Sequence, residues 1–433
     1  MIDINLIRDD GTRCKVIESE KKRFRDGRAV EEAHKLDRTR IRMNFELDEI
    51  NKKVNRLNRE IKQHFKNGGK KEDAEVCSRV EESERLCNEA EELREQVKGV
   101  EMNLAKMMKG IGNVVFDEVV VSNDEESNLI VGSYRSERRL EENPVPFSVL
   151  MKDYTHAAAG AKVVGHRGYY LSGAMAKLAQ ALARYAIDFL ERHGYVYIQT
   201  PVMLRRDVMA RTSQLSDFDD QLYKVEDDMY LIATSEQSLS ALYMEERIVP
   251  QDLPKKFCGQ SLCFRKEAGA HGKDNAGLFR VHQFEKIEQF VVCGPEESEK
   301  HHKDMMRICE EFYQSLDISY NVVSIVSGEL NDAAAIKYDL EAFFPCSGKY
   351  RELVSCSNCT DYQSRELDIR YGVGKDNKRK VYVHLLNGTM CAIQRALCCI
   401  VENYQCAEGI MVPKVLQGYF GGSIIGNAIN KRD

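Results

Sequence analysis

The sequence is poor in several features that mark other classes of protein. None of its 433 residues is tryptophan, only 8 are proline, and no low-complexity tract occurs. A membrane-spanning helix needs about eighteen or more apolar residues in a row. The most apolar stretch, residues 174–190, is interrupted by Lys177, Arg184 and Asp188, so a membrane span is excluded. With 30% charged and 43% hydrophobic residues, the composition is typical of a folded soluble protein.

Targeting signals and a disulfide framework are also missing. The first residues, MIDINLIRDD, have neither the apolar core of a signal peptide nor the acid-free composition of a transit peptide. The 14 cysteines follow no regular spacing, which fits reduced thiols better than disulfides. We therefore expect a cytoplasmic protein with no membrane partner.

The chain is longer than one hydrophobic core usually supports, which predicts two domains or one large domain with an appendage. Its formal net charge is −6, yet residues 21–66 carry about fifteen basic against eight acidic side chains. One basic segment in an acidic protein indicates an anionic partner for that segment.

Residues 29–108 contain almost no turn residues except Asn67-Gly68-Gly69. Apolar residues recur there at spacings of three and four, which predicts two long helices folded back on each other as an antiparallel coiled-coil hairpin. The expected seam residues are Met43, Leu47, Ile50, Val54, Leu57, Ile61 and Phe65 on the first helix, and Val76, Val80, Cys87, Ala90, Leu93, Val97, Val100, Leu104 and Met107 on the second. A helix of about 38 residues spans about 57 Å. Such a hairpin serves either as a dimerisation or spacer element or as a nucleic-acid-binding arm, and the basic excess favours the arm.

Beyond residue 110 the sequence changes to shorter segments with glycine, proline and alternating patterns. We place the domains at 1–110 and 111–433. The second domain is expected to have strands at 195–200, 229–233, 261–266, 279–293 and 381–386, and helices at 174–192, 238–246, 296–316 and 389–404. Strands in adjacent pairs favour an antiparallel sheet flanked by helices, and hence an α+β fold overall.

Charged residues cluster in the segment FRKEAGAHGKDNAGLFRVHQFEKIEQF, residues 264–290. Alternation along two strands would place Arg265 and Glu267 on one face, together with Arg280, His282, Phe284, Lys286 and Glu288. A buried sheet face does not tolerate so many charges, so this face borders a ligand site or is simply solvated and cross-linked by salt bridges. Arginine forks suit phosphate, and an exposed phenyl ring suits a nucleotide base.

These residues carry a family resemblance. Arg265-x-Glu267 followed by Arg280-x-x-x-Phe284 resembles motif 2 of the class II aminoacyl-tRNA synthetases, the unit ending in Gly194 and Pro201 resembles motif 1, and NGTMCAIQRALCCIVENYQ with Arg395 resembles motif 3. Thr234-Ser235-Glu236, Glu288, the run RELVSCSNC at 351–359 and Asn387-x-Thr389 are similar to the seryl-tRNA synthetase family, in its eukaryotic cytosolic form. The opening residues and the helical hairpin resemble the same family.

The resemblance implies ATP-dependent activation of L-serine to seryl-adenylate and transfer of the seryl group to serine tRNA, and also to selenocysteine tRNA. It assigns catalysis to Arg265 and Arg395, and Mg²⁺ to Glu352 and Ser355, whose hard oxygen donors suit this ion. The implied ATP-binding residues are Arg265, Lys266, Glu267, Val281, Phe284, Glu352, Leu353, Val354, Ser355 and Arg395. The implied serine-binding residues are Thr234, Ser235, Glu236, Arg265, Glu288, Asn387 and Thr389.

The family resemblance also implies a homodimer whose helical arm binds the long variable arm of serine tRNA. We assign this tRNA binding to Lys52, Lys53, Arg56 and Arg59. Cys356-x-x-Cys359 lacks a second well-spaced pair, so no structural zinc is expected. His301-His302 is expected to be solvated on a polar helix.

Some positions depart from the family pattern. The usual Gly-Arg-Asp-Thr-Arg-Gly of the motif 2 loop reads Gly-Lys-Asp-Asn-Ala-Gly at residues 272–277, with Lys273, Asn275 and Ala276 in the altered positions, and a usual tryptophan is Phe343. Two alternatives to an active enzyme are a catalytically inactive paralogue that binds tRNA or protein, and a coiled-coil interaction protein. The retained ATP and serine residues argue against the first alternative, and the ordered charges from 265 to 288 argue against the second.

Overall fold

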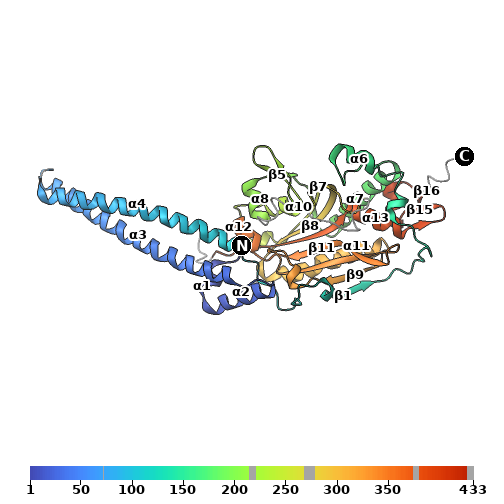
Figure 1. Ribbon diagram of the computed structural model, residues 1–433, viewed down its shortest axis with the longest axis horizontal. Helices are drawn as coiled ribbons and strands as arrows, with labels where there is room; N and C mark the ends of the chain where they lie inside the picture. Colours follow the sequence, from blue (N-terminus) through green and yellow to red (C-terminus); the bar gives the residue numbers. More distant parts are fainter. Residues whose placement is uncertain (72, 214–220, 268–277, 374–379, 427–433) are drawn as a thin grey trace. The chain divides into compact units, whose positions relative to one another are not determined.

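The computed structural model describes residues 1–71, 73–213, 221–267, 278–373 and 380–426 (Figure 1). The chain divides into two compact units, Met1–Val114 and Val115–Asp433. The expected boundary lies at residues 110–112. No described helix is both long and apolar enough to cross a membrane.

The first unit is helical, and its two long helices lie side by side as a hairpin (Figure 1). The helices of this unit are α1 (Ile4–Arg8), α2 (Asp10–Lys22), α3 (Arg28–Lys66) and α4 (Ala74–Lys109). Gly27, with φ 72°, precedes α3 in the left-handed conformation that glycine adopts without steric cost. The expected helical hairpin is therefore confirmed.

The seam of the hairpin follows a seven-residue repeat. Five buried residues of α4 recur at that interval, and Ile50 of α3 packs with Leu86 and Ala90 of α4; the five are Val76, Ser83, Ala90, Val97 and Leu104. Two expected seam residues were wrong. Leu86 is buried and Cys87 is exposed, because the second buried position of the heptad lies three residues after Ser83. Phe65 is 44% exposed because it lies in the last turn of α3.

The base of the hairpin contains a buried ion pair network. Asp37 on α3 is fully buried and accepts hydrogen bonds from Arg8 Nε at 2.7 Å and from Arg40 Nη2 at 2.8 Å. Burial opposes the ionised form of Asp37, but the two arginines hold its pKa below the ordinary value. The network ties α1 to α3.

The second unit is built on an eight-stranded sheet with the order β1-β9-β10-β11-β13-β8-β7-β2. Its strands are β1 (Leu129–Tyr134), β2 (Val196–Gln199), β7 (Lys255–Phe264), β8 (Gln283–Cys293), β9 (Tyr320–Ser324), β10 (Ile336–Phe344), β11 (Lys349–Asn358) and β13 (His384–Ala392). All neighbouring pairs are antiparallel except β2 and β7. The expected antiparallel sheet flanked by helices is confirmed.

Among the helices that pack against this sheet, the main core is completed by α7 (Gly173–Arg192), α11 (Ser298–Ser315) and α13 (Ile393–Asn403). The residues Leu178, Leu182, Tyr185 and Phe189 of α7 are buried within the chain itself. The remaining α-helices of the described part of this unit are α5 (Phe147–Leu150), α6 (Ala157–Val164), α8 (Arg206–Thr212), α10 (Ser235–Ser240), α12 (Tyr362–Glu366) and α14 (Gln417–Phe420). Small sheets are formed by β3 (Met203–Arg205), β4 (Lys224–Val225) and β5 (Met229–Leu231), by β6 (Arg247–Ile248) and β12 (Arg370–Tyr371), and by β14 (Gln405–Cys406), β15 (Gly409–Met411) and β16 (Ile424–Gly426).

Strand β8 has one face for packing and one for polar groups. Ile287 and Val291 belong to the main core with α7, α11 and α13. Because successive strand residues point to opposite sides, Lys286 and Glu288 lie on the other face. The charged pair Lys286 and Glu288 therefore lies on the face away from the main core.

Several expected element limits were wrong. Strand β8 begins at Gln283 and not at 279, and helix α13 begins at Ile393 and not at 389. Thr389 is held in β13 opposite Glu288, because β13 is a central strand paired on both sides. His301 and His302 are buried and not solvated, because they lie on the stripe of α11 that packs against the sheet with Met305 and Cys309.

Candidate active site

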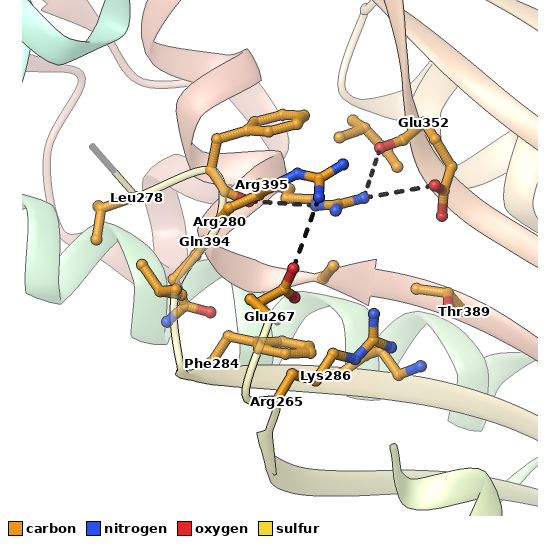
Figure 2. A pocket seen from close by; sticks show the side chains of 14 residues that line it. Arg265, Glu267, Leu278, Arg280, Phe284, Lys286, Glu352, Thr389, Gln394 and Arg395 are labelled. Carbon is orange, nitrogen blue, oxygen red and sulfur yellow. Dashed lines mark hydrogen bonds and ion pairs between the residues drawn. The ribbon is translucent and has the colours of Figure 1, made fainter. Parts of the chain in front are cut away.

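The polar face of the sheet contains an open cavity (Figure 2). Its walls come from the segment around β7 and β8, from β11, and from the end of β13 with the start of α13. Eight residues expected in the ATP or serine sites line it: Arg265, Glu267, Val281, Phe284, Glu352, Leu353, Thr389 and Arg395. Figure 2 shows that the labelled charged side chains of this set converge on one space.

Arg265 is fixed just beyond the end of β7. Its backbone N–H donates to His282 O at 2.9 Å, and its Nε donates to Ala233 O at 3.3 Å. The guanidinium carbon lies 5.2 Å from the centroid of the Phe284 ring, which is within the range of a cation–π contact. The neighbouring Lys266 is anchored through its backbone N–H to Gln221 O. Arg265 therefore has a defined place beside an aromatic face.

Glu267 faces Arg280 across the cavity. Arg280 Nη1 lies 3.6 Å from Glu267 Oε2, as the dashed line in Figure 2 marks. Val281, the residue after Arg280, is buried. The altered motif 2 residues Lys273, Asn275 and Ala276 lie outside the described residues.

Arg395 closes the cavity from α13. Its Nε donates to Phe279 O at 3.3 Å, its guanidinium carbon is 4.9 Å from the Phe279 ring centroid, and its Nη1 lies 3.5 Å from Glu352 Oε2. Two arginines, Arg265 and Arg395, thus approach the cavity from different elements. This arrangement concentrates positive charge where an anionic ligand can enter.

A bulge in β11 brings Glu352 and Ser355 to one side of the strand. Val354 pairs with Leu340 and Glu352 with Glu341, so Leu353 is the extra residue. Without a bulge, residues three apart point to opposite faces. Glu352 is half exposed, and Leu353 and Val354 are buried. Glu352 lines the cavity and Ser355 lies on the same side of the strand, and their hard oxygen donors form a set that fits Mg²⁺.

A second cluster of polar side chains adjoins the cavity at Lys286 and Thr389. Lys286 Nζ forms a buried ion pair with Glu288 Oε2 at 2.6 Å, and Thr234 Oγ1 donates to the same oxygen at 3.3 Å. Thr389 lies opposite Glu288 in the β8–β13 ladder. Glu288 is therefore surrounded by a cation and two hydroxyl-bearing residues.

Glu236 lies near the other end of this cluster. Its Oε1 accepts hydrogen bonds from Gln363 Nε2 at 2.9 Å and from Asn387 Nδ2 at 3.0 Å. Thr234 caps α10 and accepts from the backbone N–H of Glu236, and Ser235 is fully buried in the first turn of that helix. Burial, followed by the neighbouring charge of Glu288, raises the pKa of Glu236 to about 7.

Three residues of this site, Lys286, Arg280 and Gln363, were not among the expected ATP-binding or serine-binding residues. Lys286 lies two residues before Glu288 on the same strand face, which is a signal that could have identified it. Arg280 was expected on the same face as Glu267, and its ion pair with Glu267 agrees with that expectation. Gln363 comes from α12, and the sequence pattern carries no signal that it meets Glu236.

The four expected arm residues, Lys52, Lys53, Arg56 and Arg59, are all exposed on α3. Lys52 pairs with Glu49 at 2.6 Å and Arg56 with Glu60 at 3.0 Å. Their spacings place these cations along consecutive turns of one helix.

Comparisons with known proteins give a family match for each of the two units of the chain. Residues 1–115 match the seryl-tRNA synthetase N-terminal domain, and residues 221–404 match the tRNA synthetase class II core domain (G, H, P, S and T). The chain is 75% identical to the serine–tRNA ligase of Encephalitozoon cuniculi, over 98% of this chain and 99% of that protein. It is 47% identical to the cytoplasmic serine–tRNA ligase of Saccharomyces cerevisiae, over 98% of this chain and 95% of that protein.

Solved structures give the same result. The cytoplasmic serine–tRNA ligase of Naegleria fowleri in complex with AMP matches with a TM-score of 0.87 and 39% identity, over 99% of both chains. The seryl-tRNA synthetase of Pyrococcus horikoshii complexed with ATP matches with a TM-score of 0.91 and 35% identity, over 99% of this chain and 100% of that one.

Proposed function

The chain belongs to the seryl-tRNA synthetase family of class II aminoacyl-tRNA synthetases, and on this premise we propose which of its residues perform each step of the reaction. It is a serine–tRNA ligase. The observation that carries the assignment of residues is the meeting of the arginine-lined cavity with the Glu236–Glu288 cluster at Lys286 and Thr389. The inactive alternative is not favoured, because both sets of side chains are intact and face one space.

ATP binds in the arginine-lined cavity. Arg265 contacts the α-phosphate, and Phe284 and Arg395 hold the two faces of the adenine ring, with Arg395 also reaching the γ-phosphate. Glu267 contacts the adenine edge, and the backbone of Val281 contacts the adenosine. Lys266, Leu353 and Val354 complete the walls. The positions of Arg265 and Arg395 on different elements support this assignment, because they can hold a bent nucleotide from two sides.

Mg²⁺ fits beside Glu352 and Ser355, since the β11 bulge places their two hard oxygen donors on one side of the strand and Glu352 lines the cavity. When bound, the ion neutralises phosphate charge and orients the leaving pyrophosphate. In the structure Arg395 pairs with Glu352, and it can turn toward the phosphates when Glu352 binds Mg²⁺ instead.

L-Serine binds in the adjoining cluster. The carboxylate of Glu236 and the hydroxyl of Thr234 receive the substrate ammonium group, and Glu288 and Thr389 meet the side-chain hydroxyl, with Asn387 and Ser235 supporting the pocket. A site built to hydrogen-bond a hydroxyl rejects an analogue that lacks it by about 10⁴-fold, because the buried polar groups are left without partners. Alanine is therefore a very poor substrate.

The chemistry is an in-line displacement that needs no protein nucleophile. A serine carboxylate oxygen attacks the α-phosphorus, the bond to the β-phosphate oxygen breaks, and pyrophosphate leaves. A hydroxyl of the terminal tRNA ribose then attacks the seryl carbonyl carbon, and AMP leaves. Arg265 stabilises the charge on the α-phosphoryl oxygens in the first step, and positioning supplies the rest of the rate gain.

The helical hairpin binds the long variable arm of serine tRNA through Lys52, Lys53, Arg56 and Arg59. Their exposure on α3 supports this role. Selenocysteine tRNA is a second substrate in this proposal. The cytoplasm is the compartment, which the names of the cytoplasmic relatives support.

The enzyme acts as a homodimer. Strand β1 forms one edge of the large sheet. Its three successive apolar residues Leu129, Ile130 and Val131 are each more than half exposed. An unprotected apolar edge strand is a pairing surface, and a second copy of the chain is the partner that covers it.

Serine-dependent exchange of pyrophosphate into ATP, followed by charging of serine tRNA, tests the proposal. We expect wild-type exchange with L-serine and not with alanine. Arg265→Ala should reduce the exchange rate by about 10² to 10³ while the protein remains folded, because one stabilising contact to the transition state is lost. Near wild-type exchange by a folded Arg265→Ala protein would contradict the assignment.

A further inference from the structure

Arg167 lies in the short loop after α6, about a hundred residues away in sequence from Glu267. Its side chain is only 7% exposed, which is unusual because arginine is rarely buried unless it has a partner. Its backbone has φ 74°, a left-handed conformation that side-chain-bearing residues seldom adopt. Backbone strain of this kind is kept where the surroundings enforce it, often at functional sites.

Arg167 contacts Glu267 at two places. Arg167 Nη1 donates to the backbone O of Glu267 at 3.1 Å, and the same nitrogen lies 3.8 Å from Glu267 Oε2. Glu267 also has a positive φ, of 51°. One guanidinium group therefore holds both the carbonyl and the carboxylate of a residue whose backbone is itself in an uncommon conformation.

The loop that carries Arg167 is pressed against α6 by two glycines. A β-carbon at Gly160 would overlap the backbone of Gly168, and a β-carbon at Gly168 would lie 2.6 Å from Gly160 O. Gly168 N–H also donates to Gly165 O at 3.1 Å. The backbone on both sides of Arg167 is thus fixed, and so is the direction from which its guanidinium approaches Glu267.

We propose that Arg167 is a positioning residue for Glu267 and, through it, a determinant of adenine recognition; this inference rests on the proposed function. A carboxylate accepts a hydrogen bond from the 6-amino group of adenine and repels the 6-oxo group of guanine or hypoxanthine. The orientation of the carboxylate decides how strongly it discriminates adenine from the 6-oxo purines. Arg280 also contacts Oε2, but its side chain is more exposed, so Arg167 is the buried anchor and Arg280 the outer one.

The test compares ATP with purine riboside triphosphate, which lacks the 6-amino group, in serine-dependent pyrophosphate exchange and in equilibrium binding. Arg167→Ala should raise the KM and Kd for ATP about tenfold and change those for the analogue less than twofold, with the serine KM unchanged. Arg167→Lys keeps the charge without the planar guanidinium fork, so its KM and Kd for ATP should lie between those of the wild type and those of Arg167→Ala. Arg307→Ala, which removes an exposed arginine on α11, is the matched control and should leave both nucleotides unaffected.

A double-variant cycle separates positioning from a general structural role. If Arg167 acts through Glu267, the Arg167→Ala/Glu267→Gln protein discriminates no worse than Glu267→Gln alone. Equal losses for ATP and the analogue, or fully additive effects of the two substitutions, would overturn the inference. A wild-type enzyme that exchanges pyrophosphate while Arg167→Ala retains full discrimination refutes only this inference, whereas a wild-type protein without serine-dependent exchange refutes the proposed function itself.

Discussion

At the scale of single residues, the two carboxylates of the proposed serine pocket have different partners. Glu288 is paired with Lys286 at 2.6 Å, whereas Glu236 receives hydrogen bonds from the neutral amides of Gln363 and Asn387. The pKa of Glu236 is accordingly raised to about 7 by burial and by the charge of Glu288. The protonation of this group therefore changes within the physiological pH range.

This raised pKa predicts that serine binding weakens as the pH falls. Glu236 must be ionised to hold the substrate ammonium group, so below about pH 7 a proton has to be released on binding. The serine KM should rise about tenfold between pH 8 and pH 6, while the ATP KM changes little. Glu236→Gln should bind serine weakly and show no such rise. A flat serine profile in the wild type would remove Glu236 from the ammonium site.

Thr389 gives a second expectation at this scale. Thr389→Val keeps the shape of the side chain but removes the hydroxyl opposite Glu288, and a buried partner of the serine hydroxyl is lost. The serine KM should rise by about tenfold or more, with the ATP KM nearly unchanged. Thr212→Val, which removes another buried threonine hydroxyl, is the control. A change confined to the ATP KM would assign Thr389 to the nucleotide site.

Predictability from sequence differed among these residues for physical reasons. Residues within one ordered motif, such as Arg265, Glu267 and Phe284, were readable because their spacing reflects one local strand pair. Gln363 was not readable, because α12 reaches Glu236 only through the tertiary fold. His302 was misjudged because its polar neighbours on α11 obscured the stripe it shares with Met305 and Cys309; burial lowers its pKa to about 4.

At the scale of elements, the register of β11 decides whether Glu352 and Ser355 can act together. Periodicity cannot reveal a bulge, since the alternation is broken by the one residue that the partner strand does not match. The same limit explains why α13 was expected to begin at 389. Thr389 to Ala392 are apolar or small enough to continue either a helix or a strand, and pairing with β8 decides for the strand.

The long helices predict an effect of charge on tRNA affinity. Reversing Lys52, Lys53, Arg56 and Arg59 should weaken tRNA binding and flatten its dependence on salt, by a slope of about 0.9 for each lost phosphate contact. Serine-dependent pyrophosphate exchange should not change. Lys98→Glu on α4, which reverses an equally exposed lysine paired with Glu95, is the matched control. An unchanged salt slope in the four-site variant would move the tRNA contact to another surface.

At the scale of the whole molecule, the proposed ATP-binding and serine-binding residues all belong to the unit Val115–Asp433. Replacing residues 47–90 by a short turn should therefore leave serine-dependent pyrophosphate exchange nearly intact. Charging of tRNA should fall sharply and lose its preference for tRNAs with a long variable arm. A shortened enzyme that charges serine tRNA as well as the full chain would reassign the hairpin to dimerisation or to another partner.

The strand order of the large sheet also governs how the protein is made. The hairpin of α3 and α4 uses contacts between neighbouring helices and can form as soon as residue 109 has left the ribosome. The sheet is different, because β13, residues 384–392, inserts between β11 and β8. Until that strand is synthesised, both of its neighbours present unpaired edges, which are sites of intermolecular association. Nascent chains that stop before residue 384 should therefore carry a folded arm and an aggregation-prone remainder.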